Sequence, residues 1–158
     1  MVIGVDPGLA STGYALLAGP PQRPRAVAVG TLKTSPRQPH PERLRDLHDG
    51  IAALVGEHGV EAAAIESWFI HPMSRSAEAR GAIIVALARA GVEVVEYSPN
   101  TIKQSVTGSG SADKRQVRAM VRRLTGAEPE TDHAADALAA AICHLSSSPL
   151  RGAIRRAR

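Results

Sequence analysis

The chain has 158 residues, of which 44% are hydrophobic and 22% are charged, proportions typical of one soluble globular domain. No apolar run approaches the ~18 residues of a membrane span, and the opening run stops at Asp6, so we expect neither a signal peptide nor a membrane-spanning helix. A single cysteine, Cys143, excludes an internal disulfide, so we expect a cytoplasmic protein.

The net charge is +4 and the isoelectric point is about 9.8. Arginine far outnumbers lysine, and the excess of basic residues is concentrated after Gln104. This balance favours a polyanionic partner such as nucleic acid, although basic surfaces also occur for solubility alone. With DNA as that partner, the protein would associate with the bacterial nucleoid.

Three strands are predicted at the start of the chain. Residues 1–6 form a buried apolar run that ends in the turn at Pro7 and Gly8. Residues 12–19 and 25–34 follow as two more strands, joined by a proline-containing hairpin connection.

A helix and a fourth strand come next, after a proline-rich loop. Apolar residues recur at helical spacing from about residue 41 to residue 56. Residues 60–66 are apolar on both faces, which predicts a strand in the interior of the sheet. Residues 68–73 are expected to form a loop.

Helix and strand alternate again in the second half of the chain. A helix is predicted at 74–90 and a strand at 92–97, followed by a short helical turn and a glycine-serine loop. Asp113 and Gln116 resemble a capping box, so another helix is expected to begin there and to run to Leu124.

The last predicted element is an alanine-rich helix that Asp132 is expected to cap. One domain would cover residues 1–148, and the basic tail, residues 149–158, is expected to be unfolded. The order of these strands and helices predicts an α/β fold, in which helices flank a mixed five-stranded sheet.

Four side chains stand out as candidate metal ligands. Asp6 and Glu66 end two apolar runs, and His133 and Asp136 share one face of the first turn of the last helix. A buried carboxylate is costly unless it is protonated, paired or bound to a metal, and strand ends meet in open α/β sheets. The alternative is a set of ordinary capping and turn carboxylates.

Three carboxylates suit two Mg²⁺ or Mn²⁺ ions ~3.5–4 Å apart, an arrangement used for displacement at phosphorus. One ion would activate water, and the other would stabilise the leaving 3′ oxygen. An imidazole as the fourth ligand favours Mn²⁺, and His133 could equally act as a general base toward the water.

Four blocks of sequence resemble the RuvC family of Holliday-junction resolvases. They are VIGVDPGLASTGYALL, AIESWF, YSPNTIKQSVTGSGSADKRQV and DHAADALAAAICH, and together they span Val2 to about His144 in the family's order. The resemblance implies an RNase H-like fold, with Asp6, Glu66 and Asp136 as the metal carboxylates. The remaining family position is commonly aspartate, so His133 implies a variant site with an altered metal preference.

The resemblance also implies a homodimer that resolves four-way DNA junctions by paired nicking of opposed strands in recombination and repair, together with the RuvA–RuvB complex. A two-fold dimer would present one site to each opposed strand. Phe69 matches an aromatic that stacks on bases at the junction centre, and Trp68 would share that role, with core packing as the alternative. Candidate DNA contacts are Lys103 and Lys114, which match family lysines, and, by charge alone, Arg75, Arg80, Arg115, Arg118 and Arg122.

Other readings are a nuclease of the same fold that cuts RNA–DNA hybrid or a ribosomal RNA precursor, and a junction-binding protein that has lost catalysis through His133. An actin-like ATPase, with residues 6–13 as a phosphate hairpin, is disfavoured because the chain is short and lacks a second phosphate loop.

Overall fold

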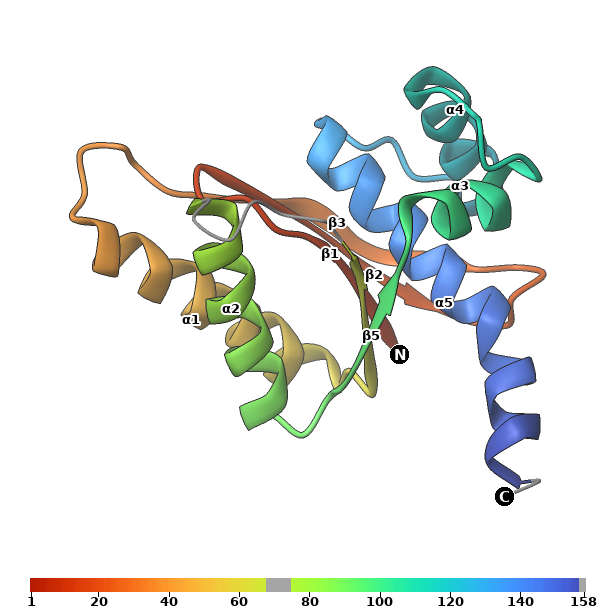
Figure 1. Ribbon diagram of the computed structural model, residues 1–158, viewed down its shortest axis with the longest axis horizontal. Coiled ribbons are helices and arrows are strands. Elements are labelled where there is room, and N and C mark those ends of the chain that lie inside the picture. Colours follow the sequence, from red (N-terminus) through yellow and green to blue (C-terminus); the bar gives the residue numbers. More distant parts are fainter. Residues whose placement is uncertain (68–74, 157–158) are drawn as a thin grey trace.

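The computed structural model describes the backbone of residues 1–67 and 75–156, and the side chains of residues 1–67 and 75–147 (Figure 1). The predicted loop at 68–73, with Trp68 and Phe69, therefore lies outside the described residues. No helix in the described part of the chain is both long and apolar enough to cross a membrane.

A five-stranded sheet in the order β3-β2-β1-β4-β5 forms the centre of the molecule. β1 pairs with β2, and β2 with β3, in antiparallel fashion, whereas β1–β4 and β4–β5 are parallel. The predicted mixed sheet is confirmed, and β4 is apolar on both faces because it lies inside the sheet. The strands are β1 (Val2–Asp6), β2 (Ser11–Ala18), β3 (Arg25–Lys33), β4 (Ala62–Glu66) and β5 (Glu93–Tyr97).

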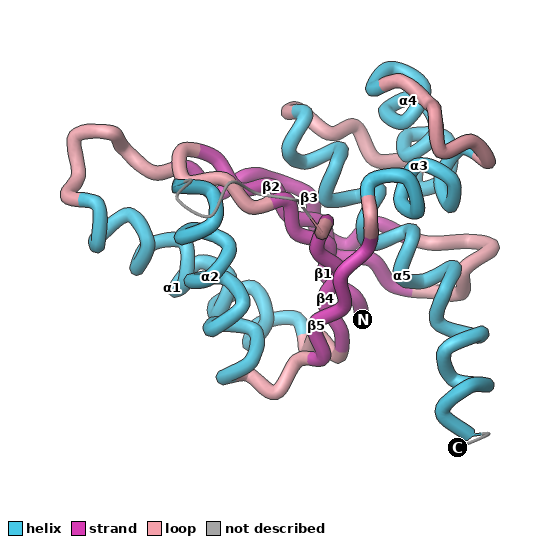
Figure 2. The backbone as a smooth tube through the Cα atoms, in the orientation of Figure 1, coloured by secondary structure: helices cyan, strands magenta, loops and turns pink. Residues whose placement is uncertain are grey.

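Helices cover both faces of this sheet (Figures 1 and 2). Two helices lie on one face and three on the other, and each layer has its own apolar core. The first layer holds α1 (His40–His58) and α2 (Arg75–Arg89), and the second holds α3 (Pro99–Thr107), α4 (Lys114–Thr125) and α5 (Asp132–Arg156). The short helical turn predicted after residue 97 is α3, a helix of nine residues.

Helix α5 packs unusually close to β1 and β2. A Cβ atom on Gly4 would lie 1.9 Å from the carbonyl oxygen of Ala137, and one on Gly13 would lie 2.0 Å from the carbonyl oxygen of His133. Only glycine permits so close an approach of two backbones. The first turns of α5 are therefore held directly over the end of β1.

The predicted N-terminal cap is correct for α4 and wrong for α5. The capping box of Asp113 and Gln116 at the start of α4 is confirmed. The predicted cap of α5 is wrong by one position, because the Oγ1 of Thr131 accepts the hydrogen bond from the backbone N–H of Ala134 at 3.1 Å. Asp132 lies in the first turn of α5, where it accepts a hydrogen bond from Arg118 instead.

The C-terminal end of α5 also differs from expectation. The backbone stays helical to Arg156, through the residues for which an unfolded tail was predicted from Pro149. In Figure 1 these last turns project beyond the sheet. The side chains after Ser147 lie outside the described ones, so the division into residues 1–148 and 149–158 stays a prediction.

Candidate functional site

Asp6 and Glu66 end two neighbouring strands. In the parallel pair β1–β4, Val5 lies opposite Ile65, so the next residue of each strand is an acid. Both acids follow residues that face the layer of α1 and α2, so both carboxylates face α5. Asp6 is only 7% exposed, and Glu66 is half-buried.

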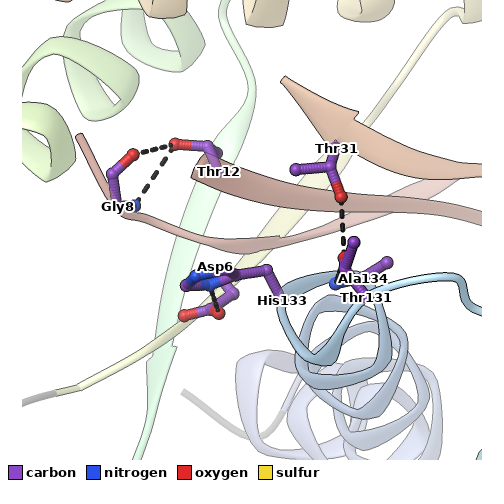
Figure 3. A network of polar contacts seen from close by, with 7 residues as sticks. All are labelled: Asp6, Gly8, Thr12, Thr31, Thr131, His133 and Ala134. Carbon is purple, nitrogen blue, oxygen red and sulfur yellow. Dashed lines mark hydrogen bonds and ion pairs between the residues drawn. The ribbon is translucent and has the colours of Figure 1, made fainter. Parts of the chain in front are cut away.

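The first turns of α5 bring the other two candidates to the same place. His133 Nδ1 lies 2.5 Å from Asp6 Oδ2 (Figure 3). Asp136 follows one helical turn later on the same face of α5. One pocket is lined by all four predicted ligands together with Pro7, Gly8, Ser76, Arg80 and Lys114.

Two carboxyl groups of this pocket have raised pKa values, and burial is the largest cause of both shifts. Burial, followed by the negative charges of Asp6 and Glu66, raises the pKa of Asp136 to about 6, although Lys114 opposes the shift. Burial also raises the pKa of Asp6, while the hydrogen bond and positive charge of His133 act in the opposite direction. A bound divalent cation would supply the missing positive charge.

The side chains as they stand are not yet arranged around an ion. Among the described residues, no group of three acidic, histidine or cysteine side chains is close enough to hold one. Asp6 and His133 contact each other directly through His133 Nδ1 and Asp6 Oδ2. The backbone thus brings the four donors to one pocket, and rotation of side chains would complete a metal site.

Hydrogen bonds of threonine hydroxyls connect the segments around the pocket (Figure 3). Thr12 Oγ1 donates to the carbonyl of Gly8 at 2.8 Å and accepts from its N–H at 3.2 Å, which closes the loop after β1. Thr31 and Thr131 share a hydrogen bond of 2.8 Å between β3 and the start of α5. Sequence reasoning missed these threonines, although Thr131 carries the ordinary signal of a helix cap.

The two predicted lysines lie beside the carboxylates. Lys114 lines the pocket that contains the four predicted ligands. It also lines a second, adjoining pocket, which Glu66 and Asp136 line as well. Lys103 lines only the second pocket, whose apolar wall is made by Pro99, Ile102, Val117 and Ala139. A polyanion that enters the site would therefore meet positive charge on the side of α3 and α4.

The predicted arginine contacts fall into three groups. Arg118 donates to Asp132 at 3.1 Å and to the carbonyl of Pro129 at 2.6 Å, and Arg122 pairs with Glu128 at 2.7 Å, so both hold α4 to the loop before α5. Arg75 and Arg115 are exposed, and Arg80 lines the pocket that contains the four predicted ligands. Ser76 also lines this pocket; sequence reasoning missed it, because only the tertiary position of α2 brings it there.

Known proteins resemble this chain over nearly its whole length. A family model described as crossover junction endodeoxyribonuclease RuvC matches residues 2–144. Proteins of that name from Alkalilimnicola ehrlichii and Syntrophomonas wolfei are 43% and 41% identical to it, over 99% and 92% of this chain and 97% and 88% of their own.

The fold is shared as well. The Thermus thermophilus RuvC in complex with a Holliday junction substrate superposes with a TM-score of 0.89 at 33% identity, over 95% of each chain. The mixed sheet with its two helical layers is therefore an RNase H-like fold, as the sequence predicts.

Proposed function

The chain belongs to the RuvC family, the crossover junction endodeoxyribonucleases, and we propose that it cuts four-way DNA junctions at the pocket that contains Asp6. The observation that carries this proposal is the meeting of Asp6, Glu66, His133 and Asp136 in one pocket beside Lys114. The likeness to a RuvC structure that holds a Holliday junction supports the same substrate here. The biological setting that follows is DNA recombination and repair.

A divalent cation fits the residues of this pocket. Burial raises the pKa of Asp6 and, together with the charges of Asp6 and Glu66, that of Asp136, and carboxylate oxygens are the ligands that Mg²⁺ and Mn²⁺ prefer. We propose two such ions, held by Asp6, Glu66, Asp136 and His133. If bound there, such ions would supply activation of a water and charge stabilisation for the departing 3′ oxygen.

His133 and Lys114 have roles that follow from their own contacts. When the His133 ring is neutral and its Nδ1–H donates to ionised Asp6, Nε2 is the atom left to accept a proton or to bind an ion. Asp6 thereby orients the ring. The ammonium group of Lys114 attracts the phosphate that is cut, and Lys103 attracts the backbone beyond it.

We propose that the protein acts as a homodimer. The outer face of α2 supports this: Val85 is 52% exposed, and Gly81 and Ala88 beside it are exposed and uncharged, so that an apolar patch lies between the charged residues Glu78 and Arg89. An apolar face of this kind suits a second copy of the chain. A two-fold dimer would present two sites to the two opposed strands of a junction, which explains paired nicking.

Three further expectations rest on the family alone. Phe69, with Trp68, would stack on bases at the junction centre; the RuvA–RuvB complex would be the partner; and the nucleoid would be the location.

The phosphate contacts can be tested through salt. Each contact that neutralises a phosphate makes the fall of junction affinity with salt concentration steeper.

A nicking assay tests the proposed function directly. Synthetic four-way junctions, linear duplex and RNA–DNA hybrid are each incubated with the protein in Mg²⁺ or Mn²⁺. We expect symmetric nicks in opposed strands of the junction and no cutting of the duplex. Preferential cutting of the hybrid would replace the junction as substrate, and tight junction binding without nicks in either metal would indicate a protein that binds but does not cut.

A further inference from the structure

Arg80 is the cation on the side of the metal pocket opposite Lys103. It lies on α2 and lines the pocket together with the acidic cluster. One Nη atom is 2.6 Å from Glu96 Oε1 of β5. Its Nε is buried and has no hydrogen-bond partner among the described residues.

An Nε–H that is buried and has no acceptor in residues 1–67 and 75–147 is a candidate donor to a ligand. A guanidinium recognises phosphate through two parallel N–H bonds, for which Nε and an Nη form one edge. A buried N–H without an acceptor is unfavourable, and a phosphate oxygen would relieve this cost. Glu96 is half exposed, whereas the side chain of Arg80 is only 21% exposed, so the carboxylate holds the guanidinium from its solvent side.

The positive charge of Arg80 is not paired with Asp6 or Asp136. No ion pair joins it to Asp6 or Asp136 within the described part of the chain, where its salt bridge is with Glu96. The lysine that counters the charge of Asp136 is Lys114. Arg80 therefore shares its charge with Glu96, and its Nε–H remains available to a phosphate.

The basic side chains Arg80, Lys114 and Lys103 follow one another along the two adjoining pockets. Arg80 lines the first pocket only, Lys114 lines both, and Lys103 lines the second only. The acids Glu66 and Asp136 lie where the pockets meet. A single strand that crosses the site would pass Arg80 on one side of the carboxylates and Lys103 on the other.

We propose that Arg80 binds the phosphate that neighbours the cut phosphate on the side away from Lys103, and that Glu96 is its positioning residue. The inference rests on the proposed function, because it assumes that a DNA strand crosses the carboxylate pocket. It adds a contact on the α2 side, so that the strand is held on both sides of the bond that breaks.

Four variants of the full chain test this inference: Arg80→Gln, Arg80→Lys, Glu96→Gln and, as matched control, Arg89→Gln. Arg89 is an exposed arginine in the last turn of the same helix, outside both pockets. Junction affinity is measured with Ca²⁺ in place of the catalytic ion, and cleavage is measured under single-turnover conditions with Mn²⁺. We expect Arg80→Gln to slow cleavage roughly 10- to 100-fold, as for loss of a charged hydrogen bond, and Arg89→Gln to match the wild type.

A neutral phosphate locates the contact. Junctions with a methylphosphonate at one of the two phosphates that flank the cut should bind wild-type protein more weakly at the Arg80 side. Arg80→Gln should be insensitive to that replacement, yet keep its sensitivity at the Lys103 side. Arg80→Lys should recover only part of the rate, because lysine lacks the bidentate edge. Glu96→Gln should slow cleavage less than Arg80→Gln and remain sensitive at both phosphates.

Two results would overturn the inference while the proposed function stands. One is a wild type that cuts junctions with Arg80→Gln indistinguishable from Arg89→Gln. The other is Glu96→Gln equal to Arg80→Gln in every measurement, with no variant altering the methylphosphonate effect, which would make the ion pair purely structural. Failure of the wild type itself to bind or cut junctions would instead refute the proposed function.

Discussion

His133 Nδ1 lies 2.5 Å from Asp6 Oδ2, although 127 positions separate the two residues. The contact joins the end of β1 to the first turn of α5 and brings the N-terminal and C-terminal parts of the chain together in one pocket. An ion held by His133 Nε2 and by the other carboxylate oxygen of Asp6 would leave this hydrogen bond in place, and the bond would then orient the ring toward the ion. Metal binding and the orientation of His133 are therefore coupled.

Asp136→Asn should abolish cutting and leave junction binding intact. Loss even of an outer-shell partner of a metal costs about 10- to 100-fold, so a lost ligand should slow single-turnover cleavage by at least about 100-fold. Removing a negative charge cannot weaken phosphate attraction. The control is Asp132→Asn, an exposed acid one turn earlier that pairs with Arg118, and it should have little effect. Equal rates for the two variants would remove Asp136 from the site.

The same carboxyl should make stability depend on pH when no divalent cation is present. Its pKa is about 6 in the folded protein and near the ordinary 3.8 in the unfolded chain, so the folded state binds the proton more tightly. The free energy of unfolding should therefore fall as the pH rises from about 4 to about 6.

Urea unfolding in chelator measures this slope. Asp136→Asn should reduce it, and the raised pKa of Asp6 should leave part of it. Saturating Mn²⁺ should reverse the slope, because the ion binds the ionised carboxylates. A slope of equal size in Asp136→Asn would show that the burial of this carboxyl does not govern the pH dependence.

His133 should set the metal preference. Imidazole suits Mn²⁺ better than Mg²⁺, so wild-type protein should cut comparatively well with Mn²⁺, and His133→Asp should shift the preference toward Mg²⁺. His133→Ala should impair cutting without unfolding α5, since alanine is the best helix former. His48→Ala, which removes a half-buried histidine of α1 that is paired with Asp49, serves as the control. Wild-type rates for His133→Ala in both metals would make His133 dispensable.

Val85→Glu should dissociate the proposed dimer. A carboxylate on the apolar face of α2 would have to be buried without a partner in the interface. Sedimentation should then show a monomer, and opposed nicks should become independent of each other. Leu124→Glu, which changes another exposed large apolar residue, should leave the dimer intact. The reverse pattern would move the interface to α4.

Phe69→Ala should reduce cleavage more than junction binding. Base stacking on an aromatic is worth roughly 1–3 kcal/mol, and it matters most once the junction centre is opened. Phe69→Trp should preserve most of the activity. An unchanged rate for Phe69→Ala would leave the stacking role to Trp68 or return Phe69 to the core.

The periodic patterns were sufficient for the strands, the main helices and the four pocket residues, because each depends on local sequence. The partners of Arg118 and Arg122 were not predictable, since Asp132 and Glu128 meet α4 only after the chain has turned back. The cap of α5 was misassigned because Thr131 and Asp132 are adjacent and are both good caps. Local chemistry could not decide which of the two caps the helix, whereas the hydrogen bond that Thr131 shares with Thr31 holds Thr131 at the start of α5.

The close packing of Gly4 and Gly13 against α5 means that the width of the metal pocket is set by backbone contact and not by the ligands themselves. The position of residue 133 is then the same whichever side chain it carries. A change between aspartate and histidine there alters the donor atom without moving the helix. The two glycines are therefore a requirement of the site's shape, because a side chain at either position would push α5 away from β1 and β2.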